Sequence, residues 1–264
     1  MAQEIKVSVI TCAYRDLGLF QEQMQGIADQ AIKEVEWIVV DDRLAPECPN
    51  QRGYVLQGKD FPVLHVPPRR YSPDFAAASA WNTGLLHARG KLAYFMNEYV
   101  TLGPDTLAKH WRAYEMFGPK VIISGPLNPE PESGHGHSRH PERMLEGGIG
   151  EIVDDDLLGG WYWAGRNDSA DLATAIACNG FDERCDGQHG GQDVEFARRM
   201  VTAGCRYLFV TDGEAFMHTY SGSKGGQGQK VGWNILYNSA KAGRTWAQND
   251  WVIANERTKA AAAA

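Results

Sequence analysis

The sequence predicts a single-domain α/β fold with a mostly parallel, Rossmann-like central sheet and helices on its faces. Two observations support this fold class. Short apolar runs that are rich in β-branched and aromatic residues alternate along the chain with longer stretches of helical periodicity. Several of these runs end abruptly in polar side chains, as buried parallel strands do at their carboxyl ends. The chain of 264 residues, 43% of them hydrophobic, is long enough to bury one large core.

Three strands and two helices are expected in the first part of the chain. The strands span residues 7–10, 36–40 and 62–66. A helix from about Asp16 separates the first two strands, which makes a βαβ unit. A second helix, rich in small residues, spans 74–90, and Asp74 is placed to cap its N-terminus.

The central strand is predicted over residues 91–96, and the polar residues Asn97 and Glu98 follow it directly. Asp41 and Asp42 follow the second strand in the same way. Because open α/β sheets bind ligands at the carboxyl ends of their strands, these four residues are candidates for a binding site. The alternative is that they are turn or capping residues, or that they leave the strands for solvent.

The second part of the chain continues the alternation. The expected elements are a helix over 104–117, a strand over 121–124, a short helix to Ala177 capped by Asp168 or Ser169, a helix after Gly191 and a strand over 206–210. Residues 126–160 show no periodicity, and a loop of that length in a compact domain is usually functional or mobile. Asp193 and Glu195 fall in the first turn of the last helix, where the helix dipole by itself would favour carboxylates.

Composition and motifs weigh against several classes of function. A formal net charge of -7 argues against general nucleic-acid binding, and no G-x-G-x-x-G follows the first strand, as a dinucleotide-dependent dehydrogenase would require. The five Cys form no C-x-x-C pair. The sequence shows neither a signal-peptide core nor an apolar run long enough to span a bilayer. From these observations together we expect a cytoplasmic protein. His135, His137 and His140 are an alternative set of metal ligands, but nothing around them sets a ligand geometry.

Four motifs follow one another along the chain, at Ile38–Asp42, Ala80–Leu85 with Ala88–Gly90, Asn179–Glu183 and Gly190–Asp193. In the order and spacing of these motifs, residues 5–220 resemble the GT-A glycosyltransferases of family 2. Each motif is weak alone, but four in the right order are a strong signal. The resemblance implies a catalytic domain over 1–220, with a nucleotide-sugar-binding half (1–103) and an acceptor-binding half (104–220) that carries the loop 126–160. Residues 221–260 would form a flexible Gly-rich segment and a helical tail.

The resemblance also assigns roles to individual residues. The donor-binding residues would be Thr11, Ala13, Tyr14, Asp41, Asp42, Arg70, Asn82, Asn97 and Glu98. The acceptor-binding residues would be Trp163, Gly191, Gln192 and Glu195. Asp193 would be the general base that takes the proton of the acceptor hydroxyl, which gives inversion at the anomeric carbon.

Three departures from the family pattern bear on the chemistry. Asn97-Glu98-Tyr99 stands where the family has Asp-x-Asp, whose second Asp binds a divalent cation. Glu98 and His218 are then the candidate ligands for Mn²⁺ or Mg²⁺, and otherwise Arg69, Arg70 or Lys224 would supply the positive charge. Gln192 replaces the Glu that usually precedes the base, and Trp81 stands in place of an Arg.

The expected activity is transfer of a sugar from a nucleoside-diphosphate sugar, most simply a UDP-sugar, to an acceptor hydroxyl. The alternative is a binding or scaffold protein of the same fold whose catalytic site has decayed, which the loss of both carboxylates of Asp-x-Asp supports.

Overall fold

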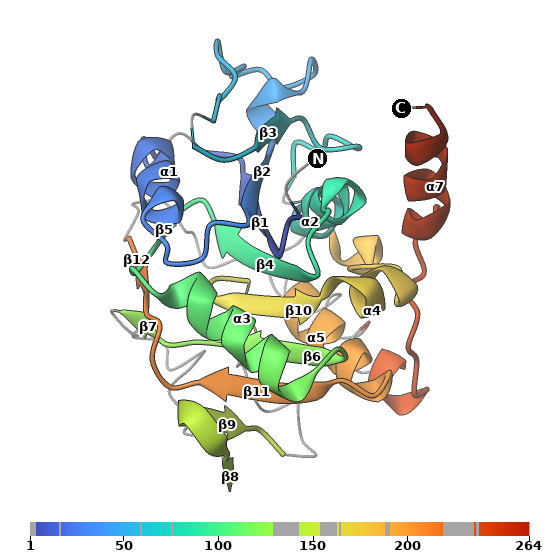
Figure 1. Ribbon diagram of the computed structural model, residues 1–264. Coiled ribbons are helices and arrows are strands. Elements are labelled where there is room, and N and C mark those ends of the chain that lie inside the picture. The colour runs from blue at the N-terminus through green and yellow to red at the C-terminus, as the bar shows by residue number, and fades with distance from the viewer. Residues whose placement is uncertain are drawn as a thin grey trace.

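One nine-stranded sheet organises the chain in the computed structural model (Figure 1). In sheet order its strands are β3 (Val63–Val66), β2 (Val35–Asp41), β1 (Val7–Ala13), β4 (Leu92–Asn97), β10 (Asp168–Asp171), β6 (Val121–Ser124), β11 (Arg206–Val210), β9 (Ile149–Glu151) and β8 (Arg143–Met144). A second sheet has the order β5 (Val100–Leu102), β12 (Ala215–Met217) and β7 (Leu127–Asn128). The structure describes residues 4–15, 17–58, 60–74, 76–128, 143–153, 163, 165–187, 191–218, 235 and 238–263.

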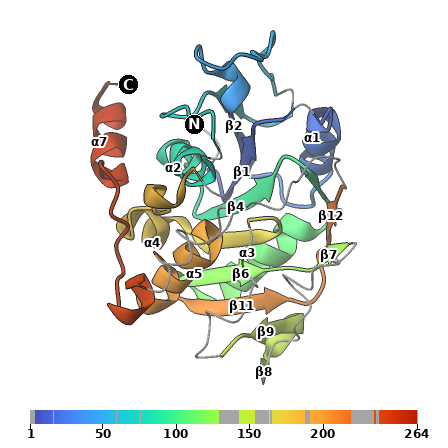
Figure 2. The same cartoon turned by 180° about the vertical axis from the view of Figure 1, so that it is seen from behind.

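Helices cover both faces of the large sheet (Figures 1 and 2). The helices α1 (Phe20–Ala28) and α3 (Thr106–Phe117) lie on one face, and α2 (Ala77–His87), α4 (Leu172–Ala177) and α5 (Gln192–Thr202) lie on the other. Side chains alternate along each strand, so that β1 buries Val7 and Val9 on the side of α1 and Ile10 and Cys12 on the side of α2. The central strands are therefore apolar on both faces, which explains why their sequences read as continuous apolar runs.

The predicted strands and helices of the first half are present, with shifted ends. The strands β1, β2, β3 and β4 pair in parallel, so the mostly parallel α/β fold class is confirmed for this part of the sheet. The helix α1 begins at Phe20 rather than at Asp16, because Gly18 adopts a φ of 72° and forms a turn ahead of it. The helix α2 begins at Ala77 rather than at Asp74.

The prediction that Asp168 or Ser169 caps a helix was wrong. These residues belong to β10, which runs antiparallel between β4 and β6, and Asp171 caps α4 instead by accepting a hydrogen bond from the Thr174 N–H at 2.9 Å. Asp168 is fully buried in this strand and accepts a 2.5 Å hydrogen bond from the Ser124 hydroxyl. A polar strand of this kind has no apolar signal in the sequence, because neighbouring side chains satisfy its buried groups.

The predicted loop 126–160 contains the short strands β7, β8 and β9, which the sequence did not predict. β9 pairs antiparallel with β11, and β8 extends the sheet from β9. The candidate metal ligands His135, His137 and His140, and the candidate cation Lys224, lie outside the described residues.

The C-terminal segment runs along one side of the molecule past α4 and ends in α7 (Ile253–Ala263), beside α2 (Figure 1). Arg257 on α7 donates to the main-chain carbonyls of Leu85 and Leu86 at 2.7 and 3.0 Å, where α2 ends. Cations are favoured at helix C-termini, so this contact stabilises both helices. Within the described ranges of the chain, no helix is long and apolar enough to cross a membrane.

Candidate active site

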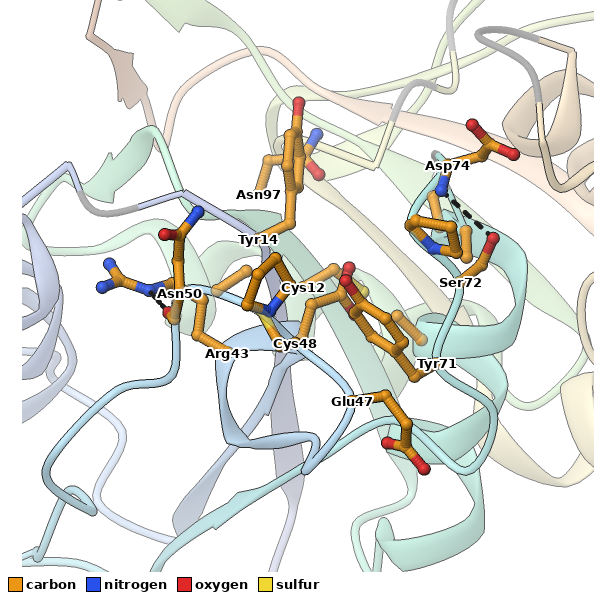
Figure 3. A pocket seen from close by; sticks show the side chains of 17 residues that line it. Cys12, Tyr14, Arg43, Glu47, Cys48, Asn50, Tyr71, Ser72, Asp74 and Asn97 are labelled. Atoms are coloured by element: carbon orange, nitrogen blue, oxygen red, sulfur yellow. Dashed lines mark hydrogen bonds between the residues drawn. The ribbon is translucent and has the colours of Figure 1, made fainter.

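A pocket of about 570 Å³ lies at the carboxyl ends of β1, β2 and β4 (Figure 3). Its lining residues come from the end of β1, the segment after β2, the segment before α2, the first part of α2 and the end of β4. They are Cys12, Ala13, Tyr14, Asp42, Arg43, Glu47, Cys48, Pro49, Asn50, Tyr71, Ser72, Pro73, Asp74, Ala76, Ala77, Ala80 and Asn97. The predicted donor residues Ala13, Tyr14, Asp42 and Asn97 are among them, so the fold brings the ends of three strands of the predicted site together.

Asp41 and Asp42 end the same strand but have different environments. Asp41 is fully buried and accepts hydrogen bonds from Arg52 Nε at 2.5 Å and from His65 Nε2 at 3.1 Å. The Leu56 N–H donates to Nδ1 of His65, so Nε2 is the protonated nitrogen that donates to Asp41. Burial would raise the pKa of Asp41, but these hydrogen bonds outweigh it and lower the pKa below its usual value.

Asp42, in contrast, lines the pocket. Burial raises the pKa of Asp42 to about 7, and the negative charges of Asp41 and Glu98 add to the rise. Asp41 is therefore a structural carboxylate that fixes the end of β2, whereas Asp42 is the one available to a ligand.

The N-terminus of α2 faces the pocket with Ala76 and Ala77, and Asp186 satisfies the first N–H groups of this helix. The Asp186 carboxylate accepts hydrogen bonds from the N–H groups of Ala78 and Ser79 at 2.9 and 3.0 Å. The prediction that Asp74 caps the helix was wrong, because Asp74 is exposed and lies before the first turn. No local pattern points to Asp186, because it lies more than 100 residues away from α2 along the chain.

Glu98 does not face the pocket but points back into the loop after β1. Its carboxylate is 3% exposed, and Oε2 accepts hydrogen bonds from the N–H groups of Tyr14 and Arg15 at 2.9 and 2.8 Å. Arg15 Nε lies 3.6 Å from the other oxygen, Oε1, which accepts no hydrogen bond from the described residues. Burial raises the pKa of Glu98 to about 7 against the opposing effect of these contacts. Glu98 therefore holds the Tyr14–Arg15 loop at the end of the central strand.

The residues predicted to hold a divalent cation do not form a ligand set that fits Mn²⁺ or Mg²⁺. His218 hydrogen bonds to the Thr101 hydroxyl through Nε2 at 3.0 Å, and the Asn97 amide donates to the Tyr99 hydroxyl at 3.1 Å. One carboxylate oxygen of Glu98 accepts hydrogen bonds from the N–H groups of Tyr14 and Arg15. Across the residues that the structure describes, no three His, Cys, Asp or Glu side chains are grouped so that they could hold a metal ion. Hard cations of this kind need several oxygen ligands around one point.

Asp193, the predicted general base, lies in the first turn of α5, which follows Gly191 in a left-handed conformation with a φ of 93°. Asp193 is half-buried, and its Oδ1 accepts a hydrogen bond from the Val194 N–H at 2.8 Å. Burial raises the pKa of Asp193, while the nearby guanidinium of Arg166 opposes the rise. Gln192 beside it is 8% exposed, and its Oε1 has no hydrogen-bond partner among the described residues.

Two of the predicted acceptor residues have structural contacts. Glu195 is fully buried and forms a 2.7 Å ion pair with Arg199, whose guanidinium also donates to the carbonyls of Cys178 and Gly180. Trp163 is 1% exposed and packs against Phe95 and Phe196, with ring centroids 5.1 Å apart in each pair. These contacts are structural, and direct binding of an acceptor by either residue stays a prediction.

Besides Asp41 and Glu98, three more predicted donor residues lie outside the pocket lining. Thr11 is buried and accepts a 2.9 Å hydrogen bond from the Trp37 indole. Asn82 is also buried, and its amide pairs with the backbone of Phe181 through both of its polar atoms, at 2.7 and 2.9 Å. Arg70 is exposed, and its neighbour Arg69 places its guanidinium 4.2 Å from the Trp251 ring centroid. Their donor-binding roles stay predictions, and burial weighs against those of Thr11 and Asn82.

Solved structures share this architecture. S. aureus TarS in complex with UDP-GlcNAc aligns over 96% of this chain and 69% of its own, with a TM-score of 0.65 and 14% identity. The mannosyltransferase PcManGT from Pyrobaculum calidifontis, in complex with GDP-Man and Mn²⁺, aligns over 98% of this chain and 75% of its own, with a TM-score of 0.54 and 17% identity. The chain has the GT-A fold.

This fold confirms the architecture that the sequence resemblance implied. A longer S. aureus TarS structure aligns with 81% of this chain at 17% identity and a TM-score of 0.60, and the chain spans 37% of its length. No family model matches the sequence, and no curated protein matches it. In the GT-A fold of this chain, the pocket lies at the carboxyl ends of the parallel strands, where open α/β folds bind their ligands.

Proposed function

We propose that the chain is a glycosyltransferase that moves a sugar from a nucleoside-diphosphate sugar to an acceptor hydroxyl. The observation that supports this function best is the pocket at the ends of β1, β2 and β4, with Asp42 and Asn97 directed to it, in a fold shared with structures that hold UDP-GlcNAc or GDP-Man. Asp42 would accept hydrogen bonds from the nucleoside, and Asn97 would contact the donor where β4 ends. UDP is the first nucleotide to test.

In the proposed reaction, Asp193 acts as general base. Its carboxylate would take the proton of the acceptor hydroxyl as that oxygen attacks the anomeric carbon, and the nucleoside diphosphate would leave from the opposite face, which inverts the configuration. A base with a raised pKa holds the transferred proton better, and burial raises the pKa of Asp193. Gly191 before it carries no side chain, so an acceptor can approach the start of α5 closely.

The test is a thermal-shift panel of UDP-, GDP-, CMP- and dTDP-sugars, followed by transfer assays with the donor that stabilises the protein. A ligand that binds the native state raises the unfolding midpoint by linkage. We expect Asp193→Asn to abolish transfer and to keep the donor-dependent shift. Unchanged transfer in that variant would remove Asp193 as the base, and no shift with any nucleotide would overturn the donor site.

One observation favours a second candidate, a nucleotide-sugar-binding protein without transfer activity. The carboxylate at the end of the central strand, Glu98, is engaged with the backbone of its own protein rather than directed to the pocket. This candidate would be favoured if a donor raised the unfolding midpoint while neither sugar transfer nor slow donor hydrolysis was detected.

A further inference from the structure

We infer that the guanidinium of Arg15, rather than a divalent cation, receives the diphosphate of the donor in this chain. The inference rests on the proposed function, because it assumes that a nucleoside diphosphate enters the pocket. It starts from the mismatch between the ligand set at the end of β4 and the needs of Mn²⁺ or Mg²⁺. The leaving group still develops negative charge on its bridging oxygen, so a fixed positive charge is needed nearby.

Arg15 follows directly on Tyr14, which lines the pocket. Its guanidinium carbon lies 4.1 Å from the centroid of the Tyr14 ring and 5.9 Å from that of the Tyr99 ring. Tyr99 stands at the position where the sequence resemblance expects a metal ligand, and its hydroxyl accepts a hydrogen bond from the pocket residue Asn97. In Figure 3, Tyr14 and Asn97 stand at the same end of the pocket. A diphosphate that continues from the nucleoside past Asn97 would therefore meet Arg15.

The backbone of Arg15 is fixed from two sides. Its N–H donates to Glu98 Oε2 at 2.8 Å, and its carbonyl accepts a hydrogen bond from Arg52 Nη2 at 3.1 Å. The side chain is 21% exposed, and its Nε lies 3.6 Å from Glu98 Oε1, so the guanidinium is partly desolvated and held beside the end of β4. A pre-positioned, weakly hydrated guanidinium suits bidentate phosphate recognition, because less entropy is lost when the hydrogen bonds form.

The other described cations near the pocket are less well placed. The guanidinium of Arg52 is committed to Asp41 in the buried end of β2. Arg43 lines the pocket on the side of Asn50, to whose carbonyl its Nε donates at 2.7 Å. Arg69 stacks on Trp251 of the C-terminal segment. Among these described arginines, Arg15 is the one whose guanidinium lies beside Tyr99 at the end of the central strand.

Calorimetric titration of the full chain with UDP and with uridine, each in EDTA and in Mn²⁺, tests the inference. We expect UDP to bind equally well with and without Mn²⁺. Arg15→Met should weaken UDP by about tenfold or more, which corresponds to the loss of a charge-assisted hydrogen-bonded contact. It should leave uridine affinity unchanged, because uridine has no phosphate. Arg15→Lys should recover part of the UDP affinity, since it restores the charge without the planar fork.

Arg143→Met is the matched control. It removes one arginine charge from β8, at the far edge of the large sheet, and should change neither affinity. UDP binding that requires Mn²⁺, or full UDP affinity in Arg15→Met, would overturn the inference and leave the proposed donor site standing. Equal weakening of UDP and uridine in Arg15→Met would also overturn it, because the residue would then be structural. If UDP does not bind the wild-type protein, the titration is repeated with GDP, and if neither binds, both this inference and the proposed donor site fail.

Discussion

The indole N–H of Trp251 donates a 2.8 Å hydrogen bond to Oε1 of Glu183. The same oxygen accepts a hydrogen bond from the Asn82 amide on α2 at 2.9 Å. Asn179 lies between α4 and Glu183. Its side chain accepts a hydrogen bond from the Ile253 N–H at 2.9 Å and donates one to the Trp251 carbonyl at 3.0 Å. The C-terminal segment is thus joined to α2 and to the turn after α4, and it belongs to the folded domain.

Replacing Trp251 by Phe should lower the free energy of unfolding by about 1–2 kcal/mol, because a buried hydrogen bond is lost while an aromatic ring is kept. The measurement is urea denaturation followed by circular dichroism. Trp246→Phe is the control, since Trp246 is 43% exposed, and it should have little effect. Equal effects of the two substitutions would show that the hydrogen bond to Glu183 contributes nothing.

Asn82→Ala separates a structural role from donor binding. Because the substitution leaves the main-chain N–H of buried Phe181 without its partner, while the Asn249 amide still donates to the Phe181 carbonyl, we expect it to cost roughly 1–3 kcal/mol of stability. Nucleotide affinity of the folded protein should stay unchanged. Asn50→Ala, in the pocket lining, should weaken nucleotide binding and leave the stability of the protein unchanged. Loss of nucleotide affinity without loss of stability in Asn82→Ala would restore its predicted donor-binding role.

The buried pair of Glu195 and Arg199 should respond strongly to removal of one partner. Arg199→Met leaves a fully buried carboxylate without its cation, which costs roughly 3–5 kcal/mol. The double variant Glu195→Leu/Arg199→Met should recover part of that loss, because the uncompensated charge is removed as well. Lys259→Met, in the exposed pair with Glu256, should have no measurable effect on the denaturation midpoint. A double variant less stable than Arg199→Met would contradict this account.

Asp42→Asn should stabilise the protein at high pH while it weakens nucleotide binding. Burial first, and then the charges of Asp41 and Glu98, raise the pKa of Asp42 from 3.8 to about 7, so the folded state binds more protons than the unfolded state between these values. The stability that this group contributes is fully present below the unfolded pKa and is lost as pH rises through the folded pKa.

The variant should therefore match the wild type at about pH 4 and exceed its free energy of unfolding by on the order of 4 kcal/mol at about pH 8. At about pH 8 the variant should also bind UDP roughly tenfold more weakly, because the ionised carboxylate is lost as an acceptor. Denaturation at a series of pH values checks the first point, and calorimetry checks the second. A stability difference that does not change with pH would contradict the pKa shift.

Local patterns predicted the elements whose signal lies in consecutive residues. The strand β4 and the helix α5 appeared where apolar periodicity placed them. The strand β10 was missed because its residues are polar, and only Ser124 on a distant strand makes buried Asp168 acceptable there. For the same reason, the cap of α2 was assigned to nearby Asp74 when the distant Asp186 provides it.

The sequence by itself determined the α/β class, the order of the main elements and the meeting of Asp42 and Asn97 at one edge of the sheet. These follow from periodicity and from the rule that parallel strands end on the same side. Only the tertiary structure decided where each polar side chain points. Glu98 was expected to bind a metal, but its carboxylate accepts hydrogen bonds from the backbone N–H groups of Tyr14 and Arg15 instead. A buried carboxylate needs hydrogen-bond donors, and a pattern of residue types along the chain does not say which donors the fold will bring to it.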